Sequence, residues 1–303
     1  MTLPVECVLT GHLARRQGRR RIGSGRETAK WRRRPLTDPG GLPAGLDPNT
    51  PNVARVYDYW LDGKDNFQVD RDFAEKIIAI EPAAPYMARQ NRGFLGRVVR
   101  FLTAEAGIRQ FIDIGTGLPT QRSVHQVAQE IAPDARVVYV DSDEVVRIHA
   151  RALLGDSSNV TAIRADFRDP EAILTHRDVN RLIDFDEPFA LLLLAILHFI
   201  PDGDDPQGII RRYSEVMAPG GHLAISCSTR EADPARADKI IEEYRKASAP
   251  AVLRTSAEIM RFFDGFELLD PGGLVYTPQW RPDGRVDADP KKAWMLAGLG
   301  RKI

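Results

Sequence analysis

The sequence predicts an α/β protein: a doubly wound, mostly parallel sheet with helices on both faces, preceded by an N-terminal helical segment. Three observations support this prediction. From residue 110 onward, short apolar runs rich in β-branched residues alternate with helical patterns, which is typical of βαβ units. The run 189–200 is almost continuously apolar, as expected for a strand covered on both faces. Apolar residues at three- and four-residue spacing recur through residues 52–103, which predicts helices before the first strand.

The predicted elements follow one another along the chain. The core strands are 111–114, 136–140, 160–163, 189–197 and 222–226. The intervening helices are 121–131, 144–154, 170–174 and 206–217. A further helix at 235–247 precedes candidate strands at 266–269, 274–276 and 294–299. The stretch 35–51 is rich in Pro and Gly and predicts a linker, so we divide the chain into an extension with linker (1–48), a helical cover (49–108) and the sheet domain (109–303).

The composition is ordinary for a globular protein, with 43% hydrophobic and 28% charged residues. No apolar run reaches the roughly 20 residues that a membrane-spanning helix needs, and the N-terminus lacks the pattern of a secretory signal. The two cysteines, Cys7 and Cys227, lie far apart and form no metal-ligand spacing. We therefore expect reduced thiols, a cytoplasmic location, no membrane span and no metal site.

The net charge of zero conceals an uneven distribution. Residues 1–34 contain ten basic and two acidic residues, so they carry +8 and the remainder carries −8. The basic segment has few apolar residues and no periodicity, which predicts a disordered tail. It is either a tail that contacts nucleic acid or another anionic surface, or an extension without function, and we favour the second interpretation. The acidic remainder argues against a duplex nucleic-acid substrate.

The first chemical motif is the turn after the first strand. Asp113 stands near the strand end, and Gly115 and Gly117 flank Thr116. Such glycines permit a tight turn and a close approach of backbone to a ligand. The third glycine of a dinucleotide fingerprint would fall at Thr120, which weakens an NAD interpretation. What remains resembles the first motif of Rossmann-like methyltransferases, in which Asp113 would lie near the methionine end of the cofactor and the glycines would shape the wall beside it. Alternatively, the Asp113 carboxylate bonds turn amides.

Acids also follow the next two strands. Asp141 ends the second strand, where a carboxylate can accept both hydrogen bonds of a ribose diol, and Ser142 and Asp143 come next. We assign ribose to Asp141 and capping of the following helix to Asp143, although either acid could be the cap. After the third strand come Asp166 and Phe167. In Rossmann-like methyltransferases an acid at this point commonly accepts from the adenine amino group, with a neighbouring apolar side chain against the ring.

The fourth strand brings Ala195 to His198 to the crevice where open α/β sheets bind ligands. His198 is either a general base for the methyl acceptor or a structural histidine that tethers a loop. We favour the second role, because methyl transfer needs no obligatory base. The Pro-Gly-Gly turn at 219–221 resembles the segment before the fifth strand of methyltransferases, and dehydrogenases do not usually show it.

Four further segments carry a closer resemblance, namely 53–67, 91–95, 110–120 and 262–265. They are similar to the signatures of the bacterial S-adenosyl methyltransferase family, long described only as a domain of unknown function. The resemblance runs from about residue 49 to the end, and it implies a class I Rossmann-like domain that binds S-adenosylmethionine beneath an N-terminal helical cover. It implies no established general acceptor. The sequence departs from the family pattern as we know it at four positions, Asp62 for Gly, Ser123 for Asn, Glu144 for Pro and Cys227 for His.

Polar residues cluster in the part that resembles the family's N-terminal signature. Arg55, Tyr57, Lys64 and Asn91 are too polar and too clustered for an ordinary core. We expect them to close over the cofactor, with Lys64, Arg55 or Arg92 meeting its carboxylate or an anionic acceptor. The alternative is a solvated helix face with loop caps.

The prediction is an S-adenosyl-L-methionine-dependent methyltransferase that acts on an unidentified small-molecule acceptor. The predicted cofactor contacts are Asp113, Gly115, Thr116, Gly117, Asp141, Ser142, Asp166, Phe167, Ala195, Arg55, Lys64 and Asn91. His198 and Tyr57 are the candidates for taking a proton from the acceptor. The alternatives are a non-catalytic sensor or partner protein that binds the same cofactor and, less favoured, an NAD-dependent oxidoreductase. We expect no nucleic-acid partner apart from nonspecific contact by the basic tail, and the sequence does not predict the oligomeric state.

Overall fold

The computed structural model describes residues 47–118, 123–144, 146, 157–286 and 288–303. All of the basic tail, most of the linker, Thr120 and most of the predicted helix 144–154 lie outside the described residues. Residues 35–303 cluster as one unit, so contacts among the described residues are contacts within that unit.

Eight strands of the described chain form one sheet, in the order β3-β2-β1-β4-β5-β8-β6, with β7 also paired to β8. The five parallel strands are β1 (Gln110–Ile114), β2 (Arg136–Asp141), β3 (Val160–Arg164), β4 (Ala190–Leu194) and β5 (His222–Ser228). The antiparallel part comprises β6 (Phe266–Leu268), β7 (Val275–Tyr276) and β8 (Met295–Lys302). The strand order reverses between β1 and β4, and such a reversal opens a crevice at the carboxyl ends of the strands.

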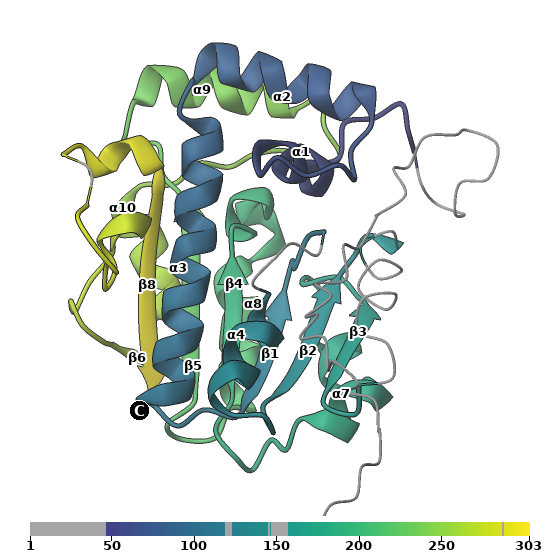
Figure 1. Cartoon of the computed structure of the whole chain (residues 1–303), viewed down its shortest axis with the longest axis vertical. Coiled ribbons are helices and arrows are strands. Elements are labelled where there is room, and N and C mark those ends of the chain that lie inside the picture. Colours follow the sequence, from purple (N-terminus) through teal and green to yellow (C-terminus); the bar gives the residue numbers. More distant parts are fainter. Residues whose placement is uncertain (1–46, 119–122, 145, 147–156, 287) are drawn as a thin grey trace, which may run out of the picture. The chain divides into compact units, whose positions relative to one another are not determined.

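Helices cover both faces of this sheet, because successive residues of each strand belong to two apolar clusters on opposite faces. Phe111 of β1 belongs to the cluster that includes α3 (Ala84–Ala104) and α4 (Val124–Ile131), which lie in front of the sheet in Figure 1. Ile112 and Ile114 point to the opposite cluster. That cluster is completed by α6 (Pro170–Leu174), α7 (Arg177–Leu182), α8 (Pro206–Glu215) and α10 (Ser256–Met260). The predicted doubly wound architecture is thereby confirmed.

Asp-Pro pairs begin three of the described α-helices. Asp169, Asp205 and Asp233 are the N-caps of α6, α8 and α9 (Pro234–Tyr244), and each carboxylate accepts a hydrogen bond from a backbone N–H of the first turn. Proline follows in each case, where its missing N–H costs nothing because the first turn has no intrahelical acceptor. These pairs fix where each helix starts.

A third apolar cluster forms the cover. It joins α1 (Val53–Trp60), α2 (Gln68–Ile80) and the start of α3 to α9, which comes from the C-terminal half of the chain. In Figure 1 these helices lie at the carboxyl ends of the parallel strands. The predicted N-terminal helical cover is therefore present, and α9 contributes to it.

No helix within the described ranges combines the length and apolarity that a membrane crossing requires.

Candidate active site

A cavity of about 760 Å³ lies at the carboxyl ends of β1, β2 and β4, between the sheet and the cover. Its volume is typical of a small-molecule site. Most residues expected at the site do line this cavity. They are Tyr57, Asp113, Gly115, Thr116, Gly117, Asp141, Ser142, Asp166, Phe167, Ala195, His198, Arg55 and Asn91. Lys64 is exposed and does not line it, so the structure separates this lysine from the other predicted residues.

The glycine turn after β1 holds the loops of β1 and β4 close together. Gly115 has φ 73°, and a Cβ at this position would lie 2.6 Å from Cδ1 of Ile196 in the loop after β4. Gly117 has φ 62°, a left-handed conformation that favours glycine. The first glycine therefore allows the close approach, and the second allows the turn to reverse.

Asp141 ties this turn to the end of β2. Its Oδ2 accepts a hydrogen bond from the Gly117 N–H at 3.0 Å, and its Oδ1 accepts one from the Asp143 N–H at 2.9 Å. Burial raises the pKa of Asp141 to about 6, although these backbone N–H groups oppose the shift. A carboxylate has about four acceptor positions, so acceptor capacity remains for a ligand.

Asp113 is a buried carboxylate beside the same turn. It is 5% exposed, and within the described part of the chain its side chain accepts no hydrogen bond. Burial raises its pKa to about 7, while the nearby Arg92 lowers it and the Asp141 charge raises it. The alternative in which Asp113 bonds turn amides is thus not observed among the described amides, and the carboxylate is available to a cationic ligand group.

Asp166 and Phe167 differ in their surroundings. The guanidinium of Arg168 donates to both oxygens of Asp166, at 3.0 Å and 2.6 Å, and this pairing lowers the pKa of Asp166. The Phe167 ring is 3% exposed and stacks on Tyr213, with the ring centroids 6.1 Å apart. Asp166 is therefore held as a charged acceptor at the cavity, whereas most of Phe167 belongs to the core.

A chain of hydrogen bonds connects the end of β4 to the cover. Ala195 has φ 60°, which is strained for a residue with a side chain, and its N–H donates to Oγ of Ser226 at 3.0 Å. Ser226 donates to Oδ1 of Asn91 at 2.6 Å, and Asn91 donates to the Tyr57 hydroxyl at 3.0 Å. Tyr57 donates in turn to the carbonyl of Ala88 at 3.1 Å. The Tyr57 hydroxyl is thus both donor and acceptor inside the protein, and burial raises its pKa.

His198 is fixed in a neutral form. The Ser228 N–H donates to its Nδ1 at 3.3 Å, so the proton of the neutral ring is assigned to Nε2. Burial, and then the charge of Arg254, lower its pKa to about 3. The His198 carbonyl also accepts from the Val252 N–H at 2.8 Å. This arrangement fits the loop-tethering alternative, because the nitrogen that could accept a proton already has a donor.

Sequence reasoning missed Arg254, which organises the loop after β4. Its guanidinium donates to the carbonyls of Leu197 and Ile200, each at 2.7 Å, and to Oδ1 of Asp202 at 2.6 Å. The residue is 3% exposed. Two of its partners are backbone carbonyls more than fifty positions away, so no local pattern could have indicated this role.

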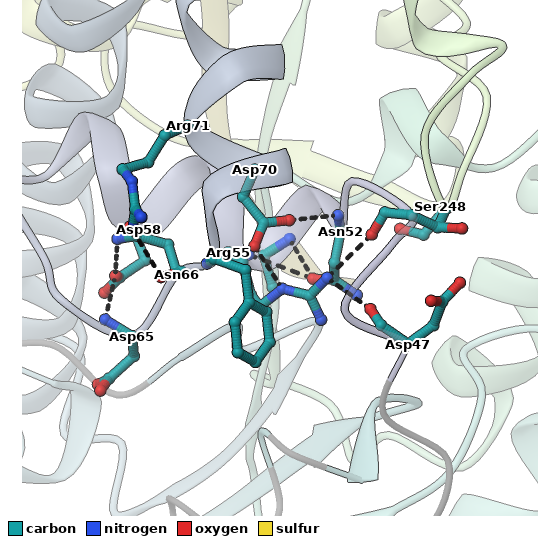
Figure 2. Close-up of polar contacts among 12 residues, drawn as sticks. Asp47, Asn52, Arg55, Asp58, Asp65, Asn66, Asp70, Arg71 and Ser248 are labelled. Carbon is teal, nitrogen blue, oxygen red and sulfur yellow. Dashed lines mark hydrogen bonds and ion pairs between the residues drawn. The ribbon is translucent and has the colours of Figure 1, made fainter. Parts of the chain in front are cut away.

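Arg55 is committed to partners within the cover. Its Nε donates to Asp70 at 2.7 Å in a buried ion pair, and its Nη2 donates to the carbonyls of Asp47 and Thr50 (Figure 2). The expectation that Arg55 meets a ligand carboxylate therefore competes with these bonds. Arg55 lines the cavity, and its bonds to Asp70, Asp47 and Thr50 connect α1 to α2 and to the segment before α1.

A strap formed by residues 51–53 crosses from the cover to two other loops. The Asn52 side chain donates from Nδ2 to Oδ2 of Asp143 at 2.9 Å. The Val53 N–H donates to Oγ of Ser248, and the Ser248 N–H donates back to the Pro51 carbonyl. Asp143 thus accepts from the strap, and its predicted role as a helix cap concerns a helix that lies largely outside the described residues.

The four departures from the family pattern lie in different surroundings. Asp62 has φ 59°, a conformation for which glycine is the better residue. Ser123 is the N-cap of α4, and Cys227 is fully buried in β5. Neither residue lines the cavity. Glu144 does line it.

The fold and the cavity define a class: α/β proteins that bind a nucleoside-bearing cofactor where the strand order reverses. Comparison with known proteins gives the family. A sequence model of the S-adenosyl methyltransferase family matches residues 40–303, and the chain belongs to this family.

Two crystal structures are similar over nearly their full length. A proposed methyltransferase from Thermobifida fusca YX is 44% identical, with a TM-score of 0.81, over 86% of this chain and 98% of that one. A DUF574 family protein from Streptomyces avermitilis MA-4680 is 38% identical, with a TM-score of 0.82, over 85% of this chain and 99% of that one. No curated protein matches the sequence. The protein is a methyltransferase that uses S-adenosylmethionine, as predicted, and its acceptor is unidentified.

Proposed function

We propose that this methyltransferase acts on a small molecule enclosed in the cavity, and that Asp141 holds the ribose diol of the cofactor. The observation that carries the second part is the Asp141 carboxylate itself. It stands at the tip of β2, it is fixed by two backbone N–H groups, and it lines the cavity with acceptor positions to spare.

The other residues fit the remaining parts of the cofactor. Asp113 is buried without a hydrogen-bond donor from the described chain, so it suits the cationic amino group of the methionine end, with Arg92 near enough to meet the carboxylate. Gly115 allows Ile196 of the loop after β4 to pack against this turn and so helps to shape the wall of the cavity. Asp166 is a charged acceptor suited to the adenine amino group. We therefore assign these residues to cofactor binding.

S-adenosylmethionine supplies a methyl group made electrophilic by its sulfonium, so the protein has to orient the acceptor and exclude water. The chain from Ala195 to Tyr57 would hold the β4 end in position for this reaction. We propose that His198 and Tyr57 act as positioning residues, because neither has a free site for accepting a proton.

We also propose a cytoplasmic location and the division into extension, cover and sheet domain at residues 48 and 108. The one cysteine within the described residues, Cys227, is a buried free thiol, which suits a reducing compartment. The apolar cluster shared by α1 and α2 supports treating residues 49–108 as a cover, and α9 packs in the same cluster from the segment 109–303.

Calorimetric titration tests the cofactor assignment. We expect S-adenosylhomocysteine to bind the wild type and NAD not to bind. Asp141→Ala should weaken S-adenosylhomocysteine binding by at least about tenfold, because two charge-assisted hydrogen bonds are lost. Asp283→Ala is the matched control, since this carboxylate is exposed and does not line the cavity. Equal affinity in wild type and Asp141→Ala would overturn the assignment.

The acceptor class is tested separately with S-adenosylmethionine labelled in the methyl group. A cell extract is divided by ultrafiltration into small molecules and macromolecules, and each part is incubated with the enzyme. We expect label in the small-molecule part only. Label confined to protein or nucleic acid would contradict a small-molecule acceptor.

A further inference from the structure

The cavity has an apolar region that the cofactor assignment does not use. Members of the cover cluster line it: Trp60, Ile77, Phe199, Ile240, Tyr244 and Trp294, hereafter the apolar chamber. The rings of Phe199 and Tyr244 contact each other with centroids 5.5 Å apart. The chamber adjoins the cofactor region through the loop after β4, where Phe199 directly follows His198.

Three charged residues of the cover that line the cavity have partners within the protein, and the fourth, Arg92, is assigned above to the cofactor. Arg55 pairs with Asp70, and Asp58 accepts from the Asp65 N–H and from Asn66. Glu81 is paired with Arg236 at 2.8 Å. A charged acceptor entering the chamber would therefore lose its hydration without gaining an opposite charge from these groups, which is costly.

Polar groups at the chamber have hydrogen-bonding capacity left: within the described residues Nε1–H of Trp60 has no acceptor, and one ring nitrogen of His198 has no partner. The Nδ1 of His198 accepts from Ser228, and within the described chain Nε2 has no partner. Since the ring lines the cavity, Nε2–H is a neutral donor for an acceptor oxygen. Next to it the Phe199 ring is only partly buried, so a ligand can reach it.

We propose that the apolar chamber binds an uncharged, planar aromatic acceptor that carries a hydrogen-bond-accepting oxygen. This inference rests on the proposed function, because it places the acceptor beside the proposed cofactor region of the same cavity. Four aromatic side chains among the six chamber residues favour a planar ring through edge and face contacts. Paired charges disfavour ions, and the His198 donor favours an oxygen-bearing ring over a pure hydrocarbon.

The test uses three probes with the same ring and different charge. The protein is saturated with S-adenosylhomocysteine at pH 7 and titrated with 1-naphthol, which is neutral, with 1-naphthylmethylamine, a cation, and with 1-naphthoate, an anion. We expect 1-naphthol to bind at least about tenfold more tightly than either ion, because only the ions lose the hydration of a charged group when they enter the chamber. Equal or tighter binding of either ion would overturn the proposal.

A variant locates the binding. Phe199→Leu removes an aromatic ring from the chamber and keeps it apolar, so 1-naphthol should bind about fivefold more weakly. Phe185→Leu is the matched control, because Phe185 packs on Phe189 in the opposite cluster and does not line the cavity. Unchanged naphthol affinity in Phe199→Leu would contradict binding in the chamber. The comparison of the three probes needs no variant, so it decides the proposal even where Phe199→Leu does not fold.

Failure of this inference is distinguishable from failure of the proposed function. Binding of S-adenosylhomocysteine without binding of 1-naphthol, in the presence or absence of that nucleoside, overturns the chamber alone. If the wild-type protein does not bind S-adenosylhomocysteine, the cofactor assignment on which the chamber rests is overturned.

Discussion

At the scale of single residues, the charge of Asp141 links cofactor affinity to pH. Its pKa in the free protein is raised to about 6 by burial, whereas hydroxyl donors of a bound ribose would favour the charged form and lower that pKa. Binding then releases a proton below about pH 6. We expect the dissociation constant of S-adenosylhomocysteine to increase by up to about tenfold per pH unit as pH falls from 6 to 5.

Asp141→Asn separates this effect from other titrations. The amide keeps one acceptor oxygen but does not titrate, so the variant should bind more weakly and with a flatter pH dependence between 5 and 6. The measurement is calorimetry across this range. A wild-type affinity that does not change between pH 5 and 7 would show that Asp141 is not in contact with the ligand.

Substitutions at two neighbouring residues of the turn after α1 are expected to have opposite effects on the free energy of unfolding. Asp62 has φ 59° and an exposed side chain, so Asp62→Gly should raise the free energy of unfolding by up to about 1 kcal/mol. At Gly63 a Cβ would lie 2.0 Å from Oδ1 of Asp58, so Gly63→Ala should lower it by about 2–3 kcal/mol. Denaturant unfolding measures both. Stabilisation by Gly63→Ala would mean that the contact with Asp58 is absent.

At the scale of elements, the loop after β4 depends on one buried guanidinium. Arg254→Met would leave the carbonyls of Leu197 and Ile200 without their donor, and we expect a loss of about 2–4 kcal/mol in the free energy of unfolding. Arg230→Met is the control, because Arg230 pairs with Asp238 on the surface and should change stability by less than about 0.5 kcal/mol. Equal effects in the two variants would contradict the role assigned to Arg254.

The strands were predictable because their apolar runs and their glycine or acidic ends are local signals. The run 111–114 became β1 (Gln110–Ile114), and the helix predicted at 170–174 was observed as α6 with the same bounds. The helices α7 and α10 were not predicted, since six and five residues are too few to show a period of 3.6 and, unlike α6, neither begins with an Asp-Pro pair. Tertiary contacts, chiefly Val179 and Ile259 in the core, stabilise them.

The candidate site was predictable where a residue's role follows from its place in a strand or turn. Asp113 and Asp141 reach the cavity because parallel strands deliver their carboxyl ends to one edge of the sheet. Roles in the cover were harder to predict. Arg55 is paired with Asp70, and Lys64 faces solvent. Ser226 of β5 connects Ala195 to Asn91 of the cover. These roles depend on which residues the folded chain brings together, so local patterns in the sequence do not indicate them.

At the scale of the whole molecule, the cover and the sheet meet across the cofactor region through Asn52. Asn52→Ser should keep a side-chain oxygen for the N-cap of α1 but lose the bond to Asp143. We expect S-adenosylhomocysteine to dissociate about threefold to tenfold faster, as measured by stopped-flow displacement. Asn49→Ser, the same change at an exposed position nearby, is the control. An unchanged dissociation rate in Asn52→Ser would show that the strap does not retain the ligand.

The most direct test of the central claim is a crystal structure of the protein with S-adenosylhomocysteine. We predict that both ribose hydroxyls donate to Asp141 at about 2.5–3.0 Å, that the amino group lies at Asp113, and that the sulfur faces the apolar chamber beside Ala195. A nucleoside bound elsewhere, or one whose ribose does not contact Asp141, would contradict the account.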